Sequence, residues 1–195
     1  MSPSTSLRTV EDDERKRELR AATSSILTRT AGGRLAAIKR PGWIAVAAEA
    51  GMLNREEWRR ALVDMLRRDG VDLLYAVPLD RANGEPPLEV PVTEEDLAAA
   101  LRQLGSFDFV LYPPDVRWAI VSTTEDIAAF FGPPPVVADL LGGDPAAARE
   151  GLEDFLDDPG FWPEKVLAYF RSLIAAIEAY DGLADGATTE LPINV

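Results

Sequence analysis

The chain has 195 residues, of which 47% are apolar and 27% are charged, proportions that are ordinary for a globular protein. It contains no cysteine and no histidine, which excludes disulfide bonds, thiolate or imidazole metal sites, and any catalytic triad that depends on histidine. The net charge of −13 is uneven, because residues 1–70 hold 14 basic and 10 acidic side chains, whereas residues 71–195 hold 6 and 23. An acidic body repels nucleic acids and anionic membranes and favours a basic protein partner, although acidity also serves solubility alone.

The sequence lacks the basic start and apolar run of a secretory signal, and no apolar run reaches the roughly 18 residues of a membrane span. No glycine-rich phosphate loop and no cofactor motif is present. We therefore expect a soluble, cytoplasmic protein without a cofactor. Abundant Ala, Arg, Asp, Gly and Pro beside few Lys suggest a GC-rich, bacterial source.

The N-terminal region predicts a tail and a helical arm. Acidic residues after Thr9 suit a helix N-terminus, and pairs such as Glu11–Arg15 support a helix over residues 10–30. The first half of this helix is almost wholly charged, so we expect it to project, or to dock through its second half. Its basic run, residues 15–20, is interleaved with acids, which indicates an exposed, salt-bridged helix rather than a contact with nucleic acid.

The middle of the chain alternates between helices and strands. Residues 43–52 predict a short helix or a buried turn, and an amphipathic helix follows. Residues 71–79 are apolar throughout and predict a central strand. Asn83-Gly84 predicts a hairpin turn, and the proline-rich return segment predicts an edge strand or an extended loop.

A helix over residues 93–104 and three short strands come next. The strands are expected at residues 107–112, 117–122 and 127–131, the last preferred to a helical turn because the run is short. The helix between residues 71–79 and 107–112 allows one parallel pair of strands with a right-handed crossover.

The last third of the chain is helical. Helices are expected over residues 134–141, 144–157 and about 163–182, with Asp144 as N-cap and Pro145 in the first turn of the second. Overall the order of elements predicts an α+β fold in which a small, mainly antiparallel sheet of 3–5 strands packs against N-terminal and C-terminal helices. The expected organisation is a tail and arm (1–33), one domain (34–183) and a flexible tail (184–195).

Two acidic regions are candidate binding surfaces. In the first, Trp118 is rimmed by Asp115, Glu125 and Asp126, an arrangement suited to recognising Arg or Lys. The alternative is a core tryptophan between ordinary polar turns. The carboxylates would serve catalysis only with a shared pocket and a raised pKa.

The second region is the segment from residue 150 to residue 158, EGLEDFLDD. It carries the carboxylates Glu150, Glu153, Asp154, Asp157 and Asp158. Like charges four residues apart are mildly destabilising in a helix. The segment is therefore a solvated helix face, a landing surface for a basic partner, or an oxygen-rich site for Mg²⁺ or Ca²⁺.

These patterns favour a non-enzymatic, acidic protein-binding module. One version is an inhibitor or immunity-type protein that covers the basic active site of its partner. One alternative is a carboxylate- or metal-dependent enzyme. Another is a subunit of a larger assembly that docks through its N-terminal helix.

Overall fold

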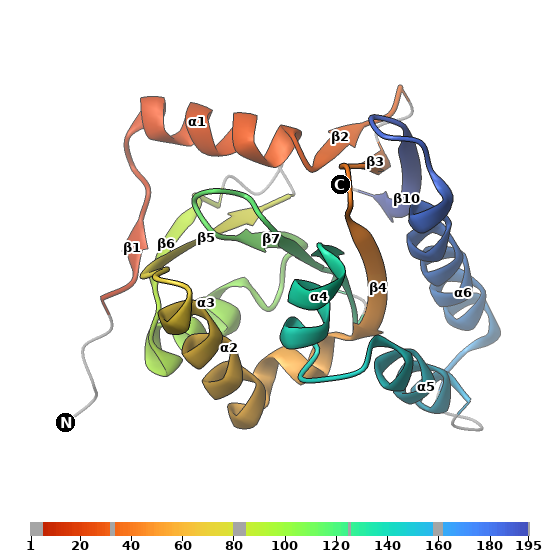
Figure 1. The fold of residues 1–195 in the computed structure, drawn as a ribbon. Helices are drawn as coiled ribbons and strands as arrows, with labels where there is room; N and C mark the ends of the chain where they lie inside the picture. The colour runs from red at the N-terminus through yellow and green to blue at the C-terminus, as the bar shows by residue number, and fades with distance from the viewer. Residues whose placement is uncertain (1–5, 32–33, 80–84, 125, 158–161, 195) are drawn as a thin grey trace.

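The centre of the protein is a seven-stranded antiparallel sheet (Figure 1). The computed structural model describes residues 6–31, 34–79, 85–124, 126–157 and 162–194. The strand order is β1-β6-β5-β7-β8-β9-β4. The strands are β1 (Arg8–Thr9), β4 (Ile44–Glu49), β5 (Leu73–Pro78), β6 (Leu88–Pro91), β7 (Phe109–Tyr112), β8 (Ala119–Ser122) and β9 (Ile127–Gly132).

A second, three-stranded antiparallel sheet has the order β10-β3-β2. Its strands are β2 (Leu27–Arg29), β3 (Arg34–Ile38) and β10 (Thr188–Asn194). The strand β10 brings the C-terminal end of the chain beside β3, with Thr189 paired to Ala37. The region expected to be a flexible tail from residue 184 therefore contains a strand.

Within the described residues, six α-helices and two short 3-10 helices surround the sheets. They are α1 (Asp13–Ser24), η1 (Ala50–Asn54), α2 (Glu56–Arg68), α3 (Glu94–Leu104), α4 (Pro134–Leu140), α5 (Pro145–Leu156), α6 (Glu164–Ala179) and η2 (Tyr180–Gly182). The predicted cap of α5 is confirmed, because the Asp144 carboxylate accepts from the Ala146 N–H, and at α3 the Thr93 hydroxyl accepts from the Asp96 N–H in the same way. No helix within the described ranges is long and apolar enough to cross a membrane.

The large sheet is buried on both faces, so the protein has three layers. Along β5, Leu74 and Ala76 pack toward α2, α3 and α4, whereas Tyr75 and Val77 pack toward α1, the small sheet, α5 and α6. Successive side chains of a strand point to opposite faces. Two hydrophobic cores therefore lie on either side of one sheet, and α5 and α6 stand beside β4 (Figure 1).

The α+β class holds, but the predicted size of the sheet was wrong. The sequence pattern predicted 3–5 strands, whereas the large sheet alone has seven. The largest miss is β4, whose sequence IAVAAE is rich in alanine, the strongest helix former. Pairing of β4 with β9 along its whole length overrides that local preference, because each residue gains a ladder partner and burial.

The expected parallel pair was also wrong, because β5 and β7 are antiparallel. The helix α3 connects β6 to β7, and β5 lies between them, so the crossover joins strands that are not neighbours. The strand at residues 127–131 is confirmed as β9. The Asn83-Gly84 turn falls outside the described residues.

The N-terminal helix is shorter than predicted and packs on the body of the protein. It ends at Ser24, and Leu27–Arg29 forms β2 instead of a further helical turn. Leu19 is buried beneath α1, and the strand β1 pairs with β6. The helix thus lies across the large sheet near β5 (Figure 1), rather than projecting as an arm.

Candidate functional site

The acidic face of α5 is formed by Glu150, Glu153, Asp154 and Asp157, all four of which are exposed. They lie at spacings of three, four and seven residues, which places them on one side of the helix. The opposite side buries Leu152 and Leu156 in the core that α5 shares with the large sheet. Asp158 lies outside the described residues.

These four carboxylates have no cationic partner among the residues that the structure describes. The basic residue of α5 itself, Arg149, pairs instead with Asp181, at 3.7 Å between Nη2 and Oδ2. Asp181 in turn accepts a hydrogen bond from the Ala45 N–H at 2.8 Å. The acidic face of α5 therefore keeps its negative charge, while Arg149 serves contacts toward β4.

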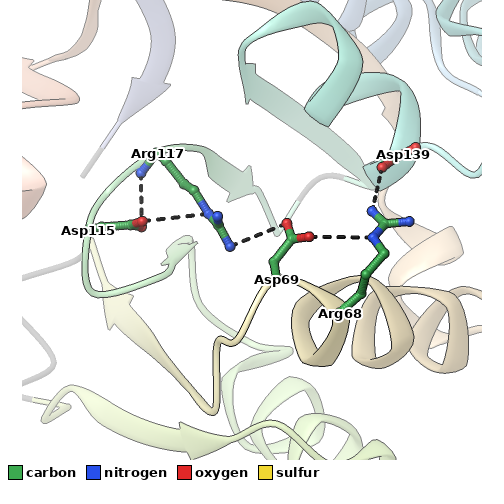
Figure 2. A network of polar contacts seen from close by, with 5 residues as sticks. All are labelled: Arg68, Asp69, Asp115, Arg117 and Asp139. Atoms are coloured by element: carbon green, nitrogen blue, oxygen red, sulfur yellow. Dashed lines mark hydrogen bonds and ion pairs between the residues drawn. The ribbon is translucent and has the colours of Figure 1, made fainter.

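The Asp115 carboxylate belongs to a chain of alternating charges (Figure 2). Asp115 pairs with Arg117, Arg117 with Asp69, Asp69 with Arg68, and Arg68 with Asp139. Hydrogen bonds to Asp139 and Asp69 raise the pKa of the Arg68 guanidinium above its ordinary value. This series of ion pairs links the end of α2, the turn between β7 and β8, and α4. The charge of Asp115 is therefore already paired with Arg117.

Trp118 is fully buried, at 0% exposure, on the side of the large sheet that faces α2 and α4. A Cβ atom built on Gly132 would lie 3.0 Å from the Trp118 Cβ, so Trp118 packs tightly against the backbone of β9. The indole Nε1 has no hydrogen-bond partner among the described residues. In this arrangement Trp118 is a core residue and is not accessible as a surface anchor.

Asp126 is exposed in the turn between β8 and β9, with a positive φ of 61°. Its carbonyl accepts a hydrogen bond from the Ala50 N–H at 2.7 Å. Because Asp115 precedes β8 and Asp126 follows it, the two carboxylates lie at opposite ends of that strand and do not share a site. Glu125 lies outside the described residues. The part of the chain that the structure describes holds no group of three acidic side chains placed to bind a metal ion.

Sequence reasoning missed a cleft of about 610 Å³ between α1, β2, the end of β5 and the segment that leads into β6. Three cations line it: Lys16 and Arg20 from α1, and Arg29 from β2. Its apolar lining includes Leu27, Val77 and Leu79. The spacing of Lys16 and Arg20, four residues apart on one helix face, could have indicated a cationic surface. The local sequence does not show, however, that β2 and β5 lie opposite these two residues.

Polar contacts hold α1 in place beside this cationic cleft. The Tyr112 hydroxyl donates to the Leu19 carbonyl at 3.0 Å and lies 3.2 Å from the Thr23 hydroxyl. Burial raises the pKa of Tyr112 to about 12, so this hydroxyl keeps its proton at neutral pH. Arg15 lies over the Tyr75 ring and hydrogen-bonds its hydroxyl.

Comparison of the chain with protein-family models, with curated proteins and with solved structures gives no match.

Proposed function

We propose that this protein is a non-catalytic binding module that receives a basic protein partner on the acidic face of α5. The observation that carries the proposal is a set of four exposed carboxylates on one helix face, without a cationic partner among the described residues. A complementary cationic patch would speed association by electrostatic steering. An inhibitor or immunity-type role, in which this face covers a basic active site, is one form of the proposal.

Repulsion between the carboxylates of α5, which destabilises this helix in the free protein, supports the proposal. Glu150 and Glu153, Glu150 and Asp154, Glu153 and Asp157, and Asp154 and Asp157 are like-charged pairs three or four residues apart. Each such pair destabilises a helix by about 0.2–0.5 kcal/mol. Asp157 also caps the C-terminal end, where the helix dipole disfavours negative charge. A basic partner would relieve these repulsions on binding. The lack of cysteine suits a reducing compartment, and we place the interaction in the cytoplasm.

The test is affinity capture from a lysate of the source cell at low and high salt, followed by calorimetry with the purified partner. The α5 variant, E150Q/E153Q/D154N/D157N, removes the charge of the face. The control variant, E57Q/D64N/D72N/E95Q, removes the same charge from exposed carboxylates on or beside α2 and α3, across the large sheet.

The proposal expects a stoichiometric basic protein that the wild type and the control variant retain and that high salt releases. The α5 variant should bind it at least about tenfold more weakly. Equal binding by the two variants, or no salt-sensitive partner at all, would contradict the proposal.

A further inference from the structure

The cationic cleft beside α1 has the size and the walls of a small-molecule site. Its volume of about 610 Å³ lies within the range of roughly 300–1,000 Å³ that is usual for such sites. Four elements frame it, and the contacts of Leu19, Tyr112 and Arg15 hold α1 in position. Contacts within the protein therefore hold the α1 wall of the cleft in place.

The charge of the cleft is opposite to that of the whole protein. Its described lining carries three cations and one carboxylate, Glu85, in a chain whose net charge is −13. Lys16 and Arg20 repel each other across one turn of α1. Lys16 also forms an ion pair with Asp13, but the Nζ–Oδ1 distance is long, at 3.6 Å, and the Asp13 side chain is 94% exposed. An exposed pair of this kind is weak, so an anion in the cleft would gain the field of both cations.

Arg29 is held so that it faces the cleft from β2. Its guanidinium Nη2 donates a hydrogen bond to the Leu79 carbonyl at 3.0 Å, which fixes the side chain at the end of β5. Arg29 therefore adds positive charge to this wall of the cleft, in addition to the contacts that it already makes. Hydroxyl groups of Ser24 and Thr28 line the same space and are exposed.

The apolar part of the lining selects against a bare inorganic ion. Leu27, Leu35, Val77 and Leu79 line the cleft with little exposure of their own, and Pro86 and Pro87 add rigid walls. The small apolar surface that they leave open, together with the aliphatic parts of the cationic side chains, can contact an organic body but gives a bare inorganic ion nothing to bind. From this combination we infer that the cleft binds a small organic anion, with an apolar or ring-shaped body and a phosphate or carboxylate head group. This site is independent of the acidic face of α5.

The experiment titrates the full chain with pairs of charged and uncharged probes. Adenosine 5′-monophosphate is compared with adenosine, and indole-3-acetate with indole-3-acetamide. Calorimetry gives the affinities, and amide NMR shifts locate the binding. The two pairs distinguish a phosphate from a carboxylate head group, and inorganic phosphate alone tests the need for an organic body.

Three variants make the test specific. K16Q/R20Q removes two cations of the cleft, and R8Q/R17Q removes the same charge from exposed residues outside it. T28W fills the cleft from an exposed position of β2 and leaves its charges in place.

At least one anionic probe should bind more tightly than its uncharged counterpart and shift amides of α1, β2 and β5. K16Q/R20Q should weaken the affinity for that anionic probe about tenfold or more, whereas R8Q/R17Q should weaken it about twofold at most. T28W should abolish binding of the probe. The α5 variant should bind as the wild type does. The inference is overturned if every probe binds more weakly than about 1 mM, if charged and uncharged partners bind alike, or if the shifts map elsewhere.

Discussion

The acidic face of α5 and the cationic cleft beside α1 lie on the same side of the large sheet, yet they are built in opposite ways. One helix supplies every described carboxylate of the acidic face, on a surface backed by Leu152 and Leu156. Four separate elements supply the cleft, which encloses apolar as well as charged side chains. A convex surface with one sign of charge suits a macromolecule, whereas a concave site with an apolar lining suits a small molecule.

The largest effect is expected from removing the buried leucine through which each helix packs on the sheet. Leu19 under α1 and Leu152 under α5 are each 2% exposed. Each change to alanine should lower the free energy of unfolding by about 2–5 kcal/mol, through lost apolar contact and the cavity left behind. Denaturant titration measures the loss.

Amide hydrogen exchange then separates the two helices. Leu19→Ala should speed exchange in α1 and leave α5 protected, and Leu152→Ala should do the reverse. If either change loosened both helices equally, the two surfaces would belong to one cooperative unit and the comparison would fail.

A smaller effect is expected at Asp96, which holds the segment leading to α1. Its carboxylate accepts from the Ser6 and Leu7 N–H groups and from the Ser6 and Thr93 hydroxyls, at 2.7–3.1 Å. Asp96→Asn should cost about 2 kcal/mol, since these bonds are made to a charged acceptor. Glu95→Gln, one position away and exposed, is the control and should change stability by less than about 0.5 kcal/mol.

Acid titration tests the same contact. Burial alone would raise the pKa of Asp96, but hydrogen bonds from Thr93, Ser6 and Leu7 outweigh it and lower the pKa below the ordinary 3.8. The stabilisation is therefore fully present above the pKa of the unfolded chain and is lost as the pH falls through the lower, folded value. Asp96→Asn should remove this part of the acid dependence, and an unchanged acid profile would contradict the assignment.

Neutralising the acidic face of α5 should stabilise the protein by about 1 kcal/mol, because like-charged pairs disappear. The α5 variant should unfold at a higher urea concentration than the wild type, and added salt should narrow the difference by screening the wild-type charges. The control variant across the sheet should not gain stability. A loss of stability in the α5 variant would mean that these carboxylates make favourable contacts.

A change in stability of similar size but opposite sign is expected at Tyr112, beside the cationic cleft. Tyr112→Phe removes the hydrogen bonds to Leu19 and Thr23 and should cost about 1 kcal/mol. Because the folded pKa is about 12 against 10.0 for the ordinary side chain, wild-type stability should be retained below pH 10 and fall as the pH rises from 10 toward 12. Urea titrations of both proteins over this window check it, since the phenylalanine variant should lack that component of the decline.

Elements with strong local signals were predictable from the sequence. Thr93 and Asp144 start α3 and α5 because their side chains satisfy free N–H groups at the helix ends, an interaction within a few residues. The strands β5, β7, β8 and β9 were predicted near their observed positions, because their apolar patterns reflect a strand buried on one or both faces.

The missed strands lack such signals. The strand β4 is rich in alanine, β2 continues a helical pattern, and β10 is the polar segment TTELPIN. The strands β4 and β10 form by pairing with partners distant in the sequence, β9 and β3, whereas β2 pairs with β3, the next strand along the chain. Local propensity spans about 1 kcal/mol in strands, and tertiary pairing readily exceeds it.

Composition and helical spacing are local properties, so the sequence alone indicated the charge imbalance, the lack of histidine and cysteine chemistry, and the line of carboxylates on α5. The fold, in contrast, buries Trp118, pairs Asp115 with Arg117, and places Asp115 and Asp126 at opposite ends of β8. It also brings Lys16, Arg20 and Arg29 together in one cleft. The physical reason is that a cleft depends on which strands pair, and that pairing is settled by contacts across the whole chain.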